Sequence, residues 1–252
     1  MPPRSRTPAR RRWRKLFATS VLLIAAAAVG MALYLDHHEQ THAQTPPAGG
    51  AGDPEGTRLL DAGQARTGLD RLTVAWNRNW ESYQRNAFGP GWSGRGGEPV
   101  LSDGCTARED VMKRDLTEAR LGESNSCLVL SGTLIDPYTG ERLPYDRFKS
   151  SQIEIDHVVA LGDAWRSGAS QWNPEQREKF ANDVGNLLAV QKQANQDKGS
   201  KTPDQWKPRQ ADWCDYARRW VSVKSRWGLT VQPTEKSARA DMLGTCGPPA
   251  NG

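Results

Sequence analysis

Two short apolar runs, about thirty residues apart, constrain the fold of this chain more than any other feature. Residues Gln152–Val159 alternate between apolar and polar and then become apolar, and Leu187–Val190 are apolar throughout. Short runs of this kind predict β-strands. The second run is followed by Lys192–Lys198, which has helical character and ends at Gly199, a common helix stop. The sequence therefore predicts a strand, a return strand and a helix.

The pattern elsewhere is mostly helical, so we expect an α+β fold in which the strands are embedded in a largely helical domain. Helices are predicted over Ala62–Arg85, Ala107–Leu121, Leu161–Ser167, Pro174–Asn182, Gln210–Gly228 and Thr234–Leu243. Two more strands, Cys127–Ile135 and Arg142–Tyr145, are joined by the turn Asp136–Gly140, and Gly89–Pro99 is a loop.

The N-terminus has the pattern of an export signal. Seven basic residues precede position 16, and residues 16–35 then carry no charge. Residues 1–43 are therefore predicted to be a signal peptide or an N-terminal membrane anchor. In either case the rest of the chain lies outside the cytoplasm, secreted or tethered to the outer face of the membrane by residues 16–35.

Removal of this segment changes the charge balance of the protein. The chain has 34 Lys and Arg against 29 Asp and Glu, but residues 1–43 hold seven of the bases and two of the acids. The remainder is neutral, so any phosphate-binding surface on it has to be local. Residues 44–58, rich in Pro, Gly and Ala, predict a flexible linker. Residues 59–248 are long enough for one domain, which we expect to be a monomer.

The cysteines also fit an exported protein. All four lie after residue 100, and their spacing matches no zinc-site pattern. Two disulfides are the better interpretation. The pairs Cys105–Cys127 and Cys214–Cys246 are favoured, because each brackets one predicted helical segment.

His157 is the only histidine outside the leader region, where His37, His38 and His42 lie. It directly follows Asp156 at the end of a predicted strand. A strand-end histidine is more often structural than functional. Here, however, Asn186 and Asn195 follow in a segment that a turn could bring back beside it. A base with hard oxygen ligands is what metal-assisted phosphodiester cleavage requires.

At these residues the sequence resembles the HNH (His-Me finger) endonucleases. The motif consists of Asp156-His157, Gly185-Asn186-Leu187-Leu188, Asn195 and Lys198-Gly199. The resemblance is closest to exported HNH proteins of actinobacteria, related to the DUF1524 group. It covers about residues 70–247, and includes Gly104–Arg108, Leu130–Leu134, Asp136–Gly140 and the Trp-rich C-terminal helix with its cysteines.

The resemblance implies a ββα-metal unit that holds one divalent cation. His157 would then be the general base that activates water, and Asn186 would hold its ring. Asp156 and Asn195 would be metal ligands. Since Asn195 stands where many HNH proteins have histidine, Mg²⁺ or Mn²⁺ is expected rather than zinc.

Other polar residues have weaker signals. Lys198 and Arg108 are candidate substrate-binding residues, although Lys198 is equally well explained as a solvated lysine at a helix end. For Arg108 and Asp163 a surface salt bridge is the simpler account. Glu154 shares a strand face with Asp156, so it is a candidate lining residue.

The tryptophans near the C-terminus recur every seven residues: Trp206, Trp213, Trp220 and Trp227. Such aromatics can stack bases, but three of them fall on one helix face with other apolar residues, which favours a stripe facing the core. The basic residues on its other faces, Arg218, Arg219, Lys224 and Arg226, are expected to be solvated.

These patterns predict a metal-dependent endonuclease whose substrate is DNA or RNA. The alternative is a secreted binding or envelope-associated protein that keeps the HNH fold without turnover. A third possibility is a phosphodiesterase with a different substrate, which the neutral surface permits. No protein partner follows from the sequence, and the N-terminal segment contacts the membrane if it is retained.

Overall fold

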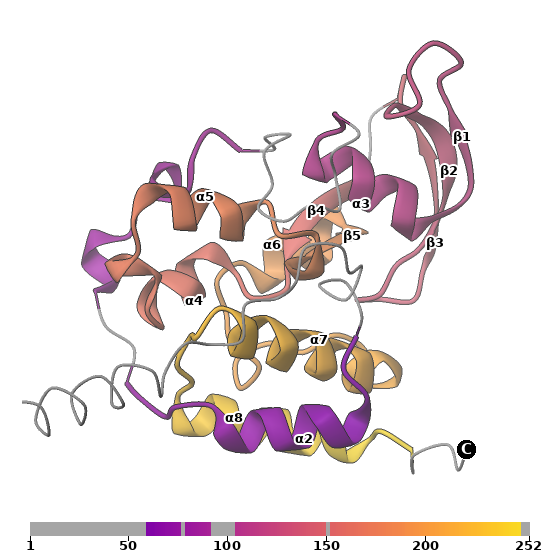
Figure 1. Ribbon diagram of the computed structural model, residues 1–252. Coiled ribbons are helices and arrows are strands. Elements are labelled where there is room, and N and C mark those ends of the chain that lie inside the picture. The colour runs from indigo at the N-terminus through magenta and orange to yellow at the C-terminus, as the bar shows by residue number, and fades with distance from the viewer. Residues whose placement is uncertain (1–58, 77–78, 92–103, 150–151, 248–252) are drawn as a thin grey trace, which may run out of the picture. The chain divides into compact units, whose positions relative to one another are not determined.

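The computed structural model of the protein describes residues 59–76, 79–91, 104–149 and 152–247 (Figure 1). All of them belong to one of the two units into which the chain divides, residues 52–252. The predicted leader and linker lie outside the described residues, so their assignment stays a prediction. Within the described part, no helix is both long enough and apolar enough to cross a membrane.

Seven α-helices, five strands and several single-turn helices make up this part of the chain. The helices are α2 (Ala62–Arg71), α3 (Ala107–Asp115), α4 (Leu161–Arg166), α5 (Pro174–Ala181), α6 (Lys192–Lys198), α7 (Trp213–Arg226) and α8 (Pro233–Gly244). The strands are β1 (Leu116–Leu121), β2 (Val129–Ile135), β3 (Arg142–Asp146), β4 (Ile153–His157) and β5 (Leu187–Gln191). The short 3-10 helices are η2 (Trp80–Ser82), η3 (Arg85–Phe88), η5 (Ala169–Gln171), η6 (Val184–Asn186) and η7 (Gln210–Asp212).

The predicted strand, return strand and helix are present as β4, β5 and α6. The two strands pair antiparallel, with Ile153 opposite Gln191 and His157 opposite Leu187. Helix α6 begins directly after β5 and contacts both strands. The end of β4 that carries His157 is therefore fixed by a partner strand, and α6 lies against the pair.

Strand β5 is apolar throughout because both of its faces are buried. Leu188 and Val190 belong to one hydrophobic core, while Leu187 and Ala189 belong to another. A strand buried on both sides loses the alternation of a surface strand. The β4–β5 pair therefore lies between the two cores.

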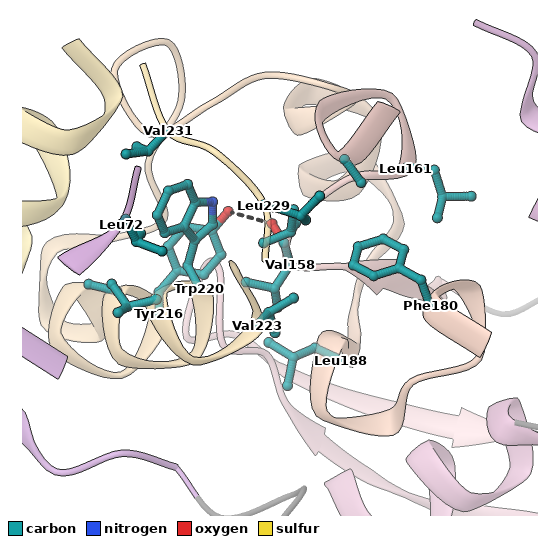
Figure 2. Packing of buried hydrophobic residues seen from close by; sticks show 14 of the residues in the cluster. Leu72, Val158, Leu161, Phe180, Leu188, Tyr216, Trp220, Val223, Leu229 and Val231 are labelled. Carbon is teal, nitrogen blue, oxygen red and sulfur yellow. Dashed lines mark hydrogen bonds between the residues drawn. The ribbon is translucent and has the colours of Figure 1, made fainter. Parts of the chain in front are cut away.

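The larger core is built mainly by helices. Helices α2, α7 and α8 contact one another, as Figure 1 shows. Figure 2 shows Trp220 and Tyr216 of α7 packed near Val158 and Leu229. Trp220 is fully buried, and Trp206, Trp213 and Trp227 pack partly buried against the same core. The prediction of a core-facing aromatic stripe is therefore confirmed.

The smaller core joins α3 to a three-stranded antiparallel sheet and to β4–β5. The order in this sheet is β1-β2-β3. Val111 and Met112 of α3 pack with Leu134 of β2 and Ile155 of β4. The turn that joins β2 to β3 is the predicted Asp136–Gly140, in which Thr139 donates its backbone N–H to the Asp136 carboxylate at 2.8 Å.

Two predicted helices were too long. The first ends at Arg71 rather than Arg85, because the chain beyond it extends and Val74 pairs in parallel with Val231. The second ends at Asp115 rather than Leu121, because Leu116 and Thr117 pair with Leu134 and Thr133 as strand β1. In both places a distant strand partner prevailed over local helix propensity.

Both disulfides have the favoured pairing, Cys105–Cys127 and Cys214–Cys246. The first encloses α3 and β1, and the second fastens α7 to the segment after α8. Neither lies in β4, β5 or α6.

Candidate functional site

Three of the residues singled out by the sequence line one cavity of about 220 Å³. Asp156 and His157 come from the end of β4, and Asn195 comes from α6. The other lining residues are Tyr83, Arg85, Ile155, Ala160, Leu161, Gly199 and Ser200. The strand pair and its helix therefore bring a carboxylate, an imidazole and an amide to one concave surface.

The imidazole of His157 is buried and hydrogen-bonded. Its Nε2 lies 2.8 Å from the carbonyl oxygen of Ala181, so Nε2–H is the donor and the lone pair of the neutral ring is on Nδ1. Burial above all lowers the pKa of His157 to about 4, although the bond to Ala181 acts in the opposite direction. The ring is consequently neutral at neutral pH and able to accept a proton.

Asn186 fixes the backbone that follows His157. Its Oδ1 accepts the backbone N–H of Val159 at 2.8 Å, and its Nδ2 donates to the carbonyl of the same residue at 3.1 Å. Its own carbonyl accepts the N–H of Val158 at 2.8 Å. These bonds join the start of β5 to the exit of β4. The sequence suggested that Asn186 holds the His157 ring, whereas these three bonds act on the main chain beside it.

Asp156 is held by two buried side chains. The hydroxyl of Tyr138 donates to its Oδ2 at 2.5 Å, and the ammonium of Lys198 lies 2.8 Å from the same oxygen. Burial, and then the charge of Asp156, raise the pKa of Tyr138 well above its ordinary value. Tyr138 therefore remains a proton donor, and the carboxylate is fixed in one orientation.

Lys198 is fully buried, not solvated at a helix end. Its ammonium also donates to the carbonyl of His157 at 2.8 Å. Burial by itself would lower the pKa of Lys198, but Asp156 and neighbouring groups raise it above its ordinary value. Its contacts thus place Lys198 at the end of β4, where it orients Asp156, and it is not among the residues that line the cavity.

The amide of Asn195 has a fixed orientation. Its Nδ2 donates to the Glu154 carboxylate at 2.9 Å. The strand-face pattern made Glu154 a candidate lining residue; it is not among the residues that line the cavity, and it contacts the site through Asn195. The carbonyl oxygen of the Asn195 amide is the atom suited to bind a cation.

The two residues with weaker signals, Arg108 and Asp163, lie elsewhere. Arg108 is on α3 and is not among the residues that line the cavity. Asp163 is buried in α4 and pairs with Lys224 at 3.1 Å, so the expected surface salt bridge is wrong. Lys224 is also fully buried, which corrects the expectation that it is solvated.

Three residues at the site carried no signal in the sequence. Tyr83 and Arg85 line the cavity although they precede the motif by about seventy residues. Tyr138 was assigned only to a turn. Its position in a turn next to β4 could not be derived from local pattern, because it depends on how the β2–β3 hairpin packs.

Two oxygen-bearing side chains of the cavity could hold a metal. Asp156 and Asn195 offer a carboxylate and an amide oxygen, which suit Mg²⁺ or Mn²⁺. Among the described residues there is no cluster of three or more His, Cys, Asp or Glu side chains placed for a metal. A cation here would therefore take its remaining ligands from water and substrate.

Comparisons with known proteins place these features in a family. Residues 106–240 match the C-terminal domain of GmrSD restriction endonucleases. An "Uncharacterized secreted protein" of Arthroderma benhamiae is 39% identical over 196 residues, which cover 77% of this chain and 90% of that protein. No solved structure matches. Since the match spans more than half of the chain and includes Asp156, His157, Asn186 and Asn195, the chain belongs to the family of GmrSD restriction endonuclease C-terminal domains.

Proposed function

We propose that this protein is an exported, metal-dependent endonuclease that hydrolyses phosphodiester bonds in nucleic acid. The observation that carries the proposal is the shared cavity of Asp156, His157 and Asn195 in a chain of a restriction-endonuclease family. In this proposal β4, β5 and α6 form a ββα-metal (His-Me finger) unit of the HNH type. Export is supported by the leader pattern and by the secreted relative.

His157 is the proposed general base. Its neutral ring takes the proton of the attacking water at Nδ1, while the Nε2–H bond to Ala181 keeps the ring in the required tautomer. Asn186 positions the ring through the main chain of Val158 and Val159. These residues orient the base before substrate binds, and so lower the cost of reorganisation in the reaction.

Asp156 and Asn195 are the proposed ligands of one Mg²⁺ or Mn²⁺. A carboxylate has lone pairs enough to bind a cation while it accepts hydrogen bonds from Tyr138 and Lys198. When bound, the cation would stabilise negative charge on the phosphate and on the leaving oxygen. Asn195 is held ready by Glu154.

A second candidate function is favoured by one contact. The Lys198 ammonium already neutralises Asp156, as would suit a secreted binding protein that keeps this fold without turnover. Such a protein would bind its ligand whether or not a divalent metal is present, and would not cleave it.

Incubation of the purified protein with plasmid, single-stranded DNA and RNA separates the two functions. We expect cleavage with Mg²⁺ or Mn²⁺ and none with EDTA. His157→Ala should reduce the rate by at least about 10²-fold, the scale of general-base catalysis, without a comparable change in melting temperature. Gln196→Ala, an exposed neighbour on α6, is the matched control and should cleave normally. Cleavage by His157→Ala at the rate of the control would remove His157 from the mechanism.

A further inference from the structure

Part of the cavity lining comes from outside the part of the chain that matches the family model. Tyr83 and Arg85 line the cavity, and both precede residue 106, where the match begins. Residues 79–88, here called the N-terminal wall, contain them together with Trp80. The lining of the cavity therefore includes groups outside the matched family domain.

The N-terminal wall is anchored by side chains of α4 and α5. The indole N–H of Trp165 donates to the carbonyl of Asn79 at 2.9 Å and to the hydroxyl of Ser82 at 3.2 Å. Arg177 donates to the carbonyl of Ala87 at 2.9 Å, and Phe88 is fully buried. These contacts hold the wall in place beside the cavity.

An aromatic surface lies on this wall. The rings of Trp80 and Tyr83 stack with centroids 5.3 Å apart and planes 12° apart. Trp80 remains 46% exposed. Gly162 allows the indole to lie close to α4, since a Cβ there would be 3.0 Å from it. Such exposed aromatic area is what proteins use to stack nucleic-acid bases.

Two arginines accompany the aromatic surface. Arg85 is exposed, and it lines the cavity together with Tyr83. The guanidinium of Arg166 lies 4.8 Å from the centre of the Trp80 ring and donates to the carbonyl of Ser200 at 2.7 Å. The domain as a whole carries no net positive charge. Attraction of a phosphate therefore has to come from local positive charges such as these two arginines.

We propose that the N-terminal wall is a nucleotide subsite, in which Arg85 binds a backbone phosphate and Trp80 with Tyr83 receives an unpaired base. This inference rests on the proposed function. A single strand offers the flat face of a base directly, whereas a duplex must first be opened. The subsite therefore makes single-stranded nucleic acid the preferred substrate over duplex.

Binding measured with the full chain tests the subsite. His157→Ala serves as the background, so that bound strands stay intact. Fluorescence anisotropy is followed with labelled single-stranded DNA, single-stranded RNA and a duplex of equal length, at several salt concentrations. On this background we expect Trp80→Ala to weaken single-strand binding by about tenfold or more, the scale of loss of one stacked base, and to change duplex binding by less than about twofold. Trp80→Phe, which keeps a ring, should restore most of the single-strand affinity.

Matched controls come from exposed residues outside the wall. Trp76→Ala removes an exposed tryptophan that lies outside the N-terminal wall, and it should leave binding unchanged. Arg85→Ala should weaken binding and reduce its salt dependence, whereas Arg120→Ala, an exposed arginine of β1, should not. Equal affinities of Trp80→Ala and Trp76→Ala for the single strands would overturn the proposal, as would an equal loss for duplex and single strand.

The two proposals fail in different ways. If the wild-type protein binds single strands through Trp80 but cleaves nothing with any metal, the subsite stands and the nuclease function is wrong. If the wild-type protein cleaves, and Trp80→Ala keeps the same ratio of single-strand to duplex cleavage, the function stands and the subsite is wrong. Comparison of the single-stranded DNA with the single-stranded RNA shows which of the two the subsite prefers.

Discussion

At the scale of single residues, the carboxylate of Asp156 makes one contact that opposes metal binding and one contact that favours it. Lys198 neutralises its charge at 2.8 Å, while Tyr138 fixes its direction at 2.5 Å. A bound cation has to share this carboxylate with an ammonium. Metal affinity then depends strongly on the second proposed ligand, Asn195, which is hydrogen-bonded to the carboxylate of Glu154 rather than to an ammonium.

We therefore expect Asn195→Ala to raise the Mg²⁺ or Mn²⁺ concentration needed for half-maximal cleavage, with little loss of stability. Asn195 is only partly buried, so its removal leaves the core unchanged. The measurement is a metal titration of the cleavage rate beside a thermal melt. Gln196→Ala on the same helix is the control. If both variants show the same midpoint and the same maximal rate as wild type, Asn195 is not a ligand.

The sequence predicted those site residues whose positions follow from one local pattern. Asp156 and His157 end a strand, and Asn195 lies in the helix after the return strand, so strand pairing brings all three together. The roles of Tyr138 and Lys198 depended instead on side-chain packing between elements distant in the chain. No period or motif records such packing, so the two interpretations of Lys198, a phosphate contact and a solvated helix end, did not include a buried ion pair with Asp156.

At the scale of elements, the junction of α4, α7 and α8 contains a buried group of ionisable side chains. Lys224 of α7 lies 3.1 Å from Asp163 of α4 and 2.9 Å from Glu235 of α8, and all three are buried. Arg239 of α8 lies over the rings of Trp220 and Tyr216. Because the desolvation of charged groups is costly, such a group stabilises the fold less than its short distances alone would suggest.

Glu235 makes this junction sensitive to pH. Burial first, and then the charge of Asp163, raise its pKa from 4.5 to about 7 against the opposing effect of Lys224. The folded protein thus keeps this proton up to about pH 7, whereas the unfolded chain releases it near 4.5. The contribution of Glu235 to the free energy of unfolding therefore falls as pH rises through this window.

We expect Glu235→Gln to remove that part of the pH dependence. Denaturant unfolding at several pH values between about 4.5 and 7 measures it, with Glu175→Gln as a control at an exposed ion pair. The wild-type and control curves should fall relative to that of Glu235→Gln as pH rises. Three parallel curves would show that Glu235 does not titrate in this window.

Element prediction from sequence succeeded where local signals and tertiary pairing agree. Asn173 caps the N-terminus of α5 and Pro174 is its first residue, which are the positions that these residue types favour. The residues Leu116–Leu121 have no such boundary signal, and they became a strand because β2 offered an edge for pairing. Thr73 and Val74 do not continue the first helix for a similar reason, because Val231 is hydrogen-bonded to the backbone of Thr73.

At the scale of the whole molecule, the two disulfides stabilise the two cores separately. Cys105–Cys127 closes a loop of 22 residues around α3 and β1, and Cys214–Cys246 closes a loop of 32 residues over α7 and α8. In the chain-entropy model each is worth roughly 3 kcal/mol. Both are outside β4, β5 and α6, so their effect on the site is indirect.

Reduction should therefore lower the melting temperature before it lowers the initial cleavage rate at low temperature. Thermal melts and initial rates are compared with and without a reductant, and peptide mapping under non-reducing conditions checks the pairing. An immediate loss of rate in a protein whose melting temperature has not moved would mean that a disulfide acts directly on the site.

The pairing of β4 with β5 also has a consequence for the order of folding. Residues 158–186, with α4 and α5 among them, separate the two strands in sequence, so the pair closes only after a long loop has been brought together. In refolding experiments we expect helical circular dichroism to return before cleavage activity does. Simultaneous recovery of both would contradict this order. If the proposed function holds, a newly synthesised chain would thus be rich in helix before it is able to cut.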